Sequence, residues 1–513
     1  MPRSCRDCLP MMPTELSAVL PARHIQEECG VFGVYAPETT DVAPLAYYAL
    51  YALQHRGQES AGIAVRRGGQ LLLRKAPGLV PEVFDKKTLS DLSGADAAIG
   101  HVRYAYDGAE RDTFRAQPLL VRHAAGDMAL CYNGKLVNAR QLRMESETRG
   151  GIFQTGTDAE IISHIIVREH LRTNTTEDAI LNAMHYMIGA YSLIVLDGKK
   201  LIAARDPNGY RPLCIGRVGG CWCAASESCA FEALGGEMVR DVEPGEVVVL
   251  TEDGPVSRNV NILARHALCS FELIYFARPD SVIDGVSVDL FRREAGRRLA
   301  RRSSVEADIV VGVPDSGLSA AQGFAEASGI PYAMGLMKNR YIPRTFIQPT
   351  QGQREQSVRI KLNAMGSTVR GKRVILVDDS IVRGTTSARL VKLLRDSGAA
   401  EVHFKVSAPP FLNPCYFGTS LPDCRELAAH GRTEEEVCSL IGADSLQYLT
   451  VVSAGAIATP VLPAITPYLC PTATDAPRNP RNHFFALKIR RSRYVYFQIR
   501  CLRRRRCGRD RRL

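Results

Sequence analysis

The sequence predicts a protein of two domains, α+β in its first half and α/β in its second, and three observations support this. The chain has 513 residues, 45% apolar and 23% charged, which is the composition of a globular protein long enough for two or three domains. Residues 29–260 alternate short β-branched runs with glycine turns and a few helical stretches. In residues 261–454, continuous apolar strands lead into polar loops and then helical patterns, which is typical of a parallel sheet covered on both faces.

The elements expected in the first half are strands and one clear helix. The runs LIVL (193–196) and VVVL (247–250) predict buried strands. A helix is predicted over 44–54, with Pro44 in its first turn and apolar residues at helical spacing, namely Leu45, Tyr48, Ala49 and Ala52. Together these segments predict layered α and β structure.

Two strands define the second half. The segments DIVVGVP (308–314) and KRVILVDD (372–379) are continuous apolar strands, and a polar loop follows each one. Parallel sheets bind ligands at the carboxyl ends of their strands. We therefore expect chemistry in the loops after Val313 and Val377.

The positive charge of the chain lies in its last segment. Net charge is +11, but residues 455–513 hold 14 Lys or Arg against 2 Asp or Glu, so the rest is nearly neutral. This excludes a nucleic-acid groove in the folded part, since such a groove needs cations clustered on a domain face. The segment is first proline-rich and then arginine-rich, without an amphipathic period, and we expect it to form no packed structure.

Other features of the composition indicate a cytoplasmic protein without a membrane span. The 15 cysteines are scattered, and residues 1–28 lack the apolar core of a signal peptide, which favours reduced thiols in the cytoplasm. Residues 445–474 carry no charge, but four prolines make a spanning helix unfavourable (Pro460, Pro463, Pro467 and Pro471).

The string VILVDDSIVRGTTS (374–387) is the most informative stretch of the chain. It joins a buried strand to Asp378 and Asp379 and then to a turn that opens a helix. Free amides at a helix N-terminus bind phosphate, Thr385 and Thr386 add hydroxyl donors, and Gly384 allows close approach of the backbone. The adjacent carboxylates suit ribose hydroxyls or Mg²⁺. An acidic strand end before a capped helix is the alternative interpretation, and the full string favours the phosphate site.

This string resembles the phosphoribosyl-diphosphate motif of type I phosphoribosyltransferases. The resemblance adds Ser380 and Arg383 to the expected binding residues, and it places Ser316, from the loop VGVPDSG (311–317), with Asp378 and Asp379 around Mg²⁺. A further loop at 338–355 is rich in cations, which are Lys338, Arg340, Arg344 and Arg354. It could close over the diphosphate and exclude water, or it could be an ordinary solvated basic loop.

The string HIQEECGVFGVYAP (24–37) resembles the start of N-terminal-nucleophile glutamine amidotransferases, whose glutaminase domain has four αββα layers. In these enzymes a propeptide, here residues 1–28, is removed to leave a cysteine first, here Cys29. The free α-amine can then serve as the base for the thiol. A buried apolar role is the commoner fate of a lone cysteine and is the alternative here.

Four further strings match the same family in order. They are QHRGQESAGI (54–63), GHVRYA (100–105), YNG (132–134) and TDAE (157–160). By resemblance, Arg103 binds the glutamine carboxylate and Asp158 its α-ammonium. Asn133 and Gly134 would form the oxyanion hole.

Both halves together, over about 29–450, resemble the amidophosphoribosyltransferases. The resemblance implies that glutamine is hydrolysed at Cys29 and that the ammonia reacts with phosphoribosyl diphosphate. The products would be 5-phosphoribosylamine, glutamate and diphosphate, the first step of purine biosynthesis. It also implies Mg²⁺, a homotetramer and feedback inhibition by purine nucleotides. The implied domains are a propeptide (1–28), a glutaminase domain (29–260), a phosphoribosyltransferase domain (261–454) and a divergent tail (455–513).

The cysteines depart from the family. Members with such a propeptide usually hold a 4Fe-4S cluster on four cysteines, and only Cys269 and Cys415 match that set, because the late C-x-x-C pair is absent. A cluster needs four thiolates, so we predict that none is bound stoichiometrically. Two alternative functions follow from the tail: a catalytically impaired relative with a frame-shifted C-terminus, or a binder of anionic surfaces through its arginines.

Overall fold

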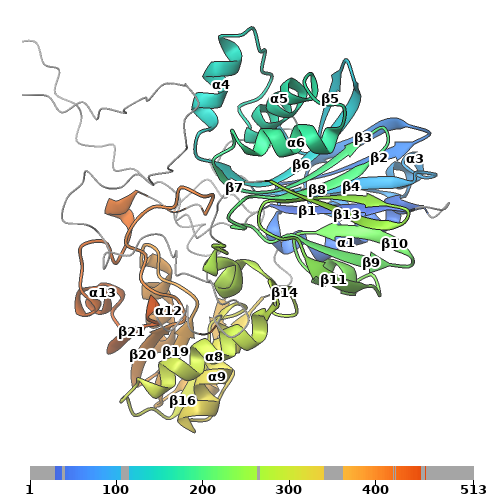
Figure 1. The fold of residues 1–513 in the computed structure, drawn as a ribbon. Coiled ribbons are helices and arrows are strands. Elements are labelled where there is room, and N and C mark those ends of the chain that lie inside the picture. The colour runs from blue at the N-terminus through green and yellow to red at the C-terminus, as the bar shows by residue number, and fades with distance from the viewer. Residues whose placement is uncertain are drawn as a thin grey trace, which may run out of the picture. The chain divides into compact units, whose positions relative to one another are not determined.

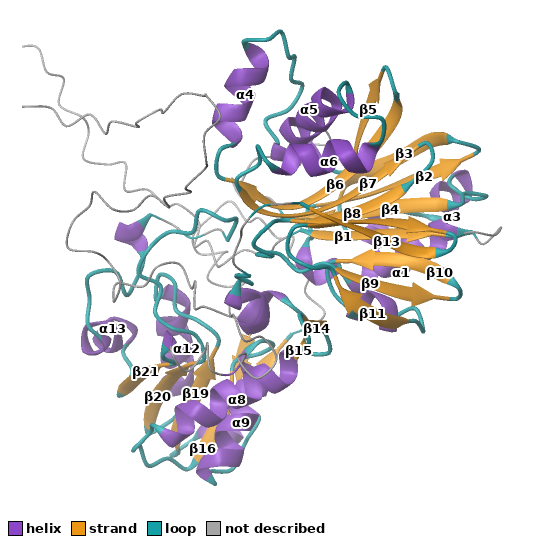
Figure 2. Ribbon diagram, in the orientation of Figure 1, coloured by secondary structure: helices purple, strands orange, loops and turns teal. Residues whose placement is uncertain are grey.

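The computed structural model describes residues 29–36, 41–104, 115–260, 262, 266–339, 362–419, 421, 423–451 and 457. The expected propeptide, most of the basic loop at 338–355 and all of the tail except residue 457 lie outside the described residues. Figures 1 and 2 show two sheet-containing regions, the first built from residues 29–259 and the second from residues after 287.

The first region contains two antiparallel sheets. In spatial order, the seven-stranded sheet contains β11 (Glu237–Asp241), β9 (Cys214–Val218), β10 (Cys221–Ala225), β1 (Gly30–Tyr35), β4 (Ala97–Arg103), β2 (Ser60–Arg67) and β3 (Gln70–Pro77). The six-stranded sheet contains β13 (Gly254–Asn259), β12 (Glu246–Thr251), β8 (Leu201–Arg205), β7 (Gly189–Asp197), β6 (Gly126–Leu136) and β5 (Leu119–His123). The runs LIVL and VVVL lie in β7 and β12, as predicted.

Helices cover the outer faces of these sheets. The helices of this region are α1 (Val42–Ala52), the 3₁₀ helix η1 (Gln54–Arg56), α2 (Val80–Val83), α3 (Lys86–Asp91), α4 (Ala139–Glu147), α5 (Asp158–His170), α6 (Thr176–Met184) and α7 (Cys229–Glu232). The predicted helix at 44–54 begins two residues earlier, because the Asp41 side chain accepts a hydrogen bond from the Ala43 amide and caps it.

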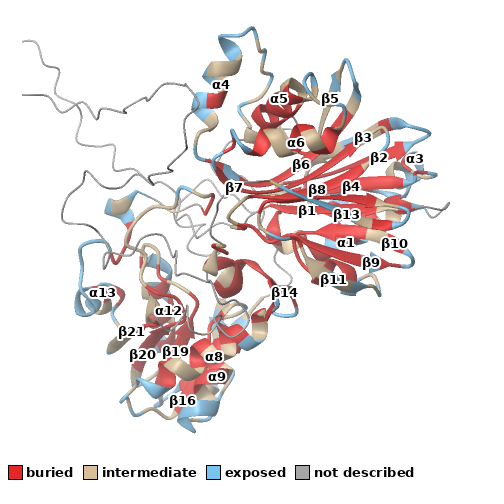
Figure 3. Cartoon of the chain, in the orientation of Figure 1, coloured by how far each residue is buried: buried red, intermediate tan, exposed pale blue. Residues whose placement is uncertain are grey.

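Strand alternation builds four layers. In β1, Phe32 and Val34 pack in the core shared with α1, whereas Val31 packs between the two sheets against residues such as Ile194 of β7. The other face of β7 packs against α5 and α6. Figure 3 shows that the strands of both sheets are buried along most of their length. The order helix, sheet, sheet, helix confirms the expected αββα fold.

A connecting segment joins the two regions. It contains the π-helix η3 (Glu272–Phe276) and a two-stranded hairpin of β14 (Val282–Ile283) and β15 (Val286–Ser287). Its apolar side chains belong to the core of the second region. Its backbone also hydrogen-bonds to the first region, for example from the Ala267 amide to the Asn208 carbonyl at 2.8 Å.

The second region has a four-stranded parallel sheet, as predicted. Its spatial order is β16 (Ile309–Gly312), β19 (Arg373–Asp378), β20 (Glu401–Val406) and β21 (Ser445–Tyr448). Helices α8 (Val288–Arg301) and α9 (Gly317–Ser328) pack on one face, and α12 (Thr385–Asp396) and α13 (Glu434–Ile441) pack on the other. The smaller elements are β17 (Leu336–Lys338), β18 (Leu362–Ala364), α11 (Gly366–Val369) and the 3₁₀ helix η4 (Cys424–Glu426).

The ends of these strands fix where a ligand can bind. Strand β19 ends at Asp378, and the loop from β16 to α9 lies beside it because β16 and β19 are paired in parallel. Both predicted loops therefore meet at one edge of the sheet. Within the described ranges, no helix is both long enough and apolar enough to cross a membrane.

Candidate functional site

Cys29 lies directly before β1 and is buried, with 6% of its surface exposed. Its thiol is 3.9 Å from the carbonyl oxygen of Tyr104, and its own carbonyl oxygen accepts a hydrogen bond from Arg56 Nε at 3.2 Å. Strand β1 pairs with β4 so that Gly30 is opposite Val102. This register brings Arg103, at the end of β4, next to the nucleophile candidate.

Asn133 is the best evidence for an oxyanion hole. It is completely buried in β6, and neither its amide nitrogen nor its amide oxygen has a hydrogen-bond partner among the described residues. A buried polar group without a partner is costly, so this amide is free to bind a ligand atom. Gly134 follows with φ of 143°, and a Cβ there would lie 2.0 Å from the Ala190 carbonyl oxygen. Only glycine fits this position.

Two residues hold the backbone before Asn133. The Gln117 side chain makes two hydrogen bonds to the backbone of Tyr132. Its oxygen accepts from the Tyr132 amide at 2.7 Å, and its nitrogen donates to the Tyr132 carbonyl at 3.3 Å. His101 Nε2 also donates to that carbonyl, at 3.1 Å. Burial lowers the pKa of His101 to about 3, so the imidazole is neutral at pH 7. These contacts fix the peptide from which the Asn133 side chain projects.

Asp158 begins α5 and is largely buried. One carboxylate oxygen accepts from the Leu136 amide at 2.9 Å and from the Tyr132 hydroxyl at 3.3 Å. Burial raises the pKa of Asp158, because hydrogen bonds only partly offset the loss of solvent. An ammonium group beside it would restore the charged form. Of the five residues predicted for the glutamine site, Cys29 thus lies just before β1, Arg103 ends β4, Asn133 and Gly134 lie in β6, and Asp158 begins α5.

Asp378 and Asp379 stand at the end of β19, and both are buried. The hydroxyls of Ser316 and Ser380 donate to the two oxygens of Asp379. Burial raises the pKa of both carboxyls, and for Asp378 the neighbouring Asp379 charge raises it further. A divalent cation would offset this repulsion. Two carboxylates and a hydroxyl fit Mg²⁺, which takes its other ligands from water and phosphate.

The turn that the sequence predicts to bind phosphate does open a helix. Gly384 precedes α12 with φ of 80°, and Thr385 and Thr386 form the first turn. Glycine has no side chain that could cap the helix, and no side-chain cap is present at this end of α12. This is the geometry of an anion site.

Gly317 brings the other loop close to the carboxylates. It begins α9, and a Cβ there would lie 2.6 Å from the Val377 carbonyl oxygen and 3.3 Å from Asp378 Cα. The loop that carries Ser316 can therefore approach β19 only because residue 317 is glycine.

The two predicted cations of this site pair with carboxylates. Lys338, at the end of β17, donates to Asp315, and Arg383 pairs with Glu426 at 2.5 Å. The other cations of the predicted closing loop (Arg340, Arg344 and Arg354) lie outside the described residues.

Sequence reasoning missed Arg292. This residue of α8 is buried, and it donates to the carbonyl oxygens of Leu273 and Ala277, each at 2.8 Å. Burial lowers the pKa of Arg292 to about 10, although the negative charge of nearby Asp379 acts to raise it. It adds a positive charge behind the two carboxylates. Nothing local distinguishes it from the surface arginines of the same helix.

Cys269 and Cys415 lie around one aromatic pair. The Cys269 amide donates to the Tyr210 carbonyl at 3.1 Å, Cys415 Sγ accepts from the Phe417 amide at 3.3 Å, and the rings of Tyr210 and Phe417 stack at 4.5 Å. Among the described residues, no three candidate ligands form a metal-binding group. Cys269 and Cys415 are only two of the four thiolates that a 4Fe-4S cluster needs.

Comparisons with known proteins agree in both halves. A model described as a glutamine amidotransferase domain matches residues 101–233, and one described as a phosphoribosyl transferase domain matches residues 293–413. The amidophosphoribosyltransferase of Bacillus subtilis is 48% identical over 429 residues, which are 83% of this chain and 89% of that protein. The enzyme of Methanocaldococcus jannaschii is 46% identical over 82% of this chain and 93% of its own.

A solved structure agrees as well. The glutamine phosphoribosylpyrophosphate amidotransferase from B. subtilis, complexed with ADP and GMP, superposes with a TM-score of 0.78 at 47% identity. The match covers 84% of this chain and 92% of that one. The chain therefore belongs to the amidophosphoribosyltransferase family and is an enzyme of purine biosynthesis that combines a glutamine amidotransferase with a phosphoribosyltransferase.

Proposed function

We propose that Cys29, freed by removal of residues 1–28, is the nucleophile that releases ammonia from glutamine. Its sulfur adds to the side-chain amide carbon, and the free α-amine takes the thiol proton and passes it to the departing nitrogen. Ammonia leaves, and water hydrolyses the thioester to glutamate. Asn133 and the Gly134 amide stabilise the tetrahedral oxyanion. The buried, unpartnered amide of Asn133 among the described residues is the observation that carries this assignment.

The substrate glutamine would be held by its two charged groups, both on the α-carbon. Arg103 binds the α-carboxylate, which suits the two-point donor geometry of a guanidinium group. Asp158 binds the α-ammonium, which favours the ionised carboxylate against the burial that raises its pKa.

The ammonia then attacks carbon-1 of phosphoribosyl diphosphate. The bond to the diphosphate oxygen breaks, diphosphate leaves, and loss of a proton from nitrogen gives 5-phosphoribosylamine. The 5-phosphate lies on the first turn of α12 with the hydroxyls of Thr385 and Thr386 and the Gly384 backbone. Asp378 and Asp379 hold the ribose hydroxyls, and Ser380 and Arg383 complete this loop.

The leaving diphosphate needs positive charge. Lys338 is near enough to Asp315 to pair with it and would turn to the diphosphate in the complex. Ser316, Asp378 and Asp379 are the residues that would hold Mg²⁺. When bound, the cation neutralises the diphosphate charge that grows as the bond breaks.

Further properties of the enzyme belong to the same proposal. We assign the glutaminase domain to 29–260, the phosphoribosyltransferase domain to 261–454, and a separate tail to 455–513. The enzyme is a cytoplasmic homotetramer inhibited by purine nucleotides in this proposal, and the inhibition fits the relative that was solved with ADP and GMP. The two alternative functions depend on the tail, and no described residue favours either.

The nucleophile is tested by Cys29→Ala. We expect glutamine-dependent synthesis to be lost and synthesis with free ammonia to remain, because only the first reaction uses the thiol. The intact mass of the active enzyme is the companion measurement. An active species that still carries residues 1–28 would contradict the role of the free amine.

The phosphoribosyl site is tested by Asp378→Asn and by Asp379→Asn. Both nitrogen donors meet the same ribose, so each variant should lose synthesis with glutamine and with ammonia. Full activity with ammonia in either variant would refute the assignment of that carboxylate.

A further inference from the structure

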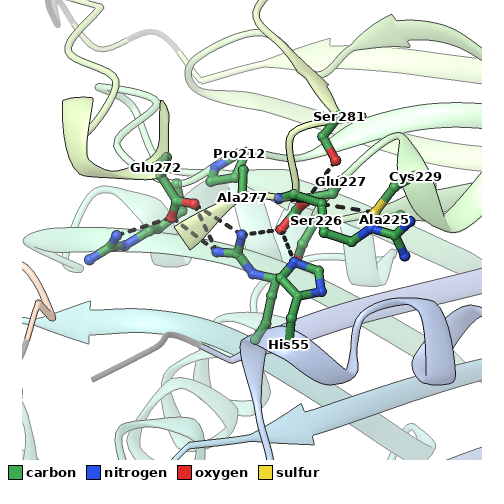
Figure 4. Close-up of polar contacts among 12 residues, drawn as sticks. His55, Pro212, Ala225, Ser226, Glu227, Cys229, Glu272, Ala277 and Ser281 are labelled. Carbon is green, nitrogen blue, oxygen red and sulfur yellow. Dashed lines mark hydrogen bonds and ion pairs between the residues drawn. The ribbon is translucent and has the colours of Figure 1, made fainter. Parts of the chain in front are cut away.

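Arg56 connects the backbone of Cys29 to two buried carboxylates, Glu227 and Glu272, with which it forms an ion-pair cluster. It lies in η1, is completely buried, and donates from Nε to the Cys29 carbonyl oxygen at 3.2 Å. Its two terminal nitrogens pair with Glu227 at 2.6 Å and with Glu272 at 3.0 Å. Figure 4 shows Glu272 and Glu227 on either side of the cluster.

The two carboxylates act differently on the guanidinium group. Glu227 accepts from one nitrogen of Arg56 only, so this contact leaves the group free to turn about it. Glu272 accepts from both terminal nitrogens, each at 3.0 Å, in the two-point arrangement that fixes the plane of the group. Because guanidinium is planar, fixing that plane also fixes the direction of the Nε–H bond toward Cys29.

Glu272 has other hydrogen-bond partners besides Arg56. It is completely buried at the start of η3, and Arg211 donates to it at 3.2 Å. The carbonyls of Leu273 in η3 and of Ala277 just after it accept hydrogen bonds from the buried Arg292 of α8. The carboxylate that orients Arg56 therefore comes from the connecting segment, 216 residues along the chain from Arg56.

We propose that Glu272 is a positioning residue for Cys29, acting through the guanidinium group of Arg56. This inference rests on the proposed role of Cys29 as the nucleophile. An N-terminal residue has no preceding peptide to hold it, so its carbonyl contact is a main restraint on the α-amine and the thiol. Turning the Arg56 plane would release that contact and move both reacting groups away from the amide of glutamine. A misplacement of about 1 Å can cost about 100-fold in rate.

Glu272→Gln and Asp284→Asn form a matched pair. Asp284 is also a buried carboxylate of the connecting segment, and it pairs through both oxygens with the buried Arg205 at 2.6 and 2.8 Å. Besides each other, Arg205 and Asp284 bond to Gly209, Arg211, Val242 and His266, and not to the guanidinium group of Arg56. Loss of a general structural link would affect both variants alike, whereas loss of a positioning contact would affect Glu272→Gln alone.

The experiment measures kcat and KM for glutamine, and synthesis with ammonia, in the enzyme from which residues 1–28 have been removed. For Glu272→Gln we expect kcat with glutamine to fall at least about tenfold, with KM and ammonia-dependent synthesis within about twofold of the native values. Asp284→Asn should keep kcat with glutamine. Arg56→Lys preserves the charge but has no Nε–H, and it should reproduce the loss of kcat. The same loss in this second variant would show that a folding defect of Glu272→Gln is not the cause.

Three results would overturn the inference. They are an unchanged kcat in Glu272→Gln, an equal fall in Asp284→Asn, and a change confined to KM. Cys29→Ala separates this failure from failure of the proposed function. If Cys29→Ala keeps glutamine-dependent synthesis, the nucleophile is wrong, whereas its inactivity beside a normal Glu272→Gln would refute the positioning role alone.

Discussion

Replacing Gly317 by alanine should impair the phosphoribosyl site without touching the glutamine site. The new Cβ would lie 2.6 Å from the Val377 carbonyl oxygen, and ordinary contact begins at 3.4 Å. The loop carrying Ser316 must therefore retreat from β19 by about 0.8 Å, because the Cβ is fixed on its Cα and the carbonyl oxygen belongs to a packed strand. A displacement of this size can cost up to about 100-fold in rate. We expect synthesis to fall about 10- to 100-fold, or roughly 1.4 to 2.7 kcal/mol in the activation barrier.

The assay is steady-state synthesis of phosphoribosylamine with glutamine and, separately, with ammonia. Both should fall equally, because both donors use the same ribose site. Gly366→Ala is the matched control, since a Cβ there meets its nearest backbone atom, the Ser397 carbonyl oxygen, at 3.8 Å. Activity of Gly317→Ala within about twofold of native, or a loss with glutamine alone, would refute the reasoning.

Three further predictions concern other parts of the chain. In the unfolded chain His101 takes up a proton near pH 6.5, and in the native protein only near pH 3, so the free energy of unfolding should fall as the pH drops below 6.5. Between pH 8 and pH 5, denaturation experiments should show a loss about 2 kcal/mol larger for the native protein than for His101→Gln. Equal losses in the two proteins would count against this prediction. Asn133→Ala should lower kcat with glutamine about 100- to 1000-fold while ammonia-dependent synthesis stays normal, and a normal kcat would remove Asn133 from the oxyanion hole. Iron and acid-labile sulfide analysis of anaerobically purified protein should find no stoichiometric cluster, whereas about four of each per chain would contradict the count of cysteine ligands.

Much of the fold could be predicted because its signals are local. Apolar runs identified β7, β12, β16 and β19, since burial on both faces demands continuous apolar sequence. The helix at 44–54 was displaced by two residues because its start depends on the Asp41 side chain, which caps it. The position of Asp378 at a strand end followed from the same local pattern.

The sequence alone also determined which residues could carry the chemistry. Cys29, Asn133 and Asp158 occur in strings whose order along the chain matches one family. Their types are those that bind and attack an amide, and this information is contained in each short string.

Only the tertiary structure decided how these residues are held. Glu272 and Arg292 look like ordinary charged residues of amphipathic segments, and His101 looks like part of a strand. Each is buried and bonds to another element of the fold: Glu272 to Arg56, Arg292 to carbonyls of the connecting segment, and His101 to a carbonyl of β6. The reason is that a buried polar or charged group is stable only beside a partner, and spacing along a sequence does not tell which group folding will bring beside it.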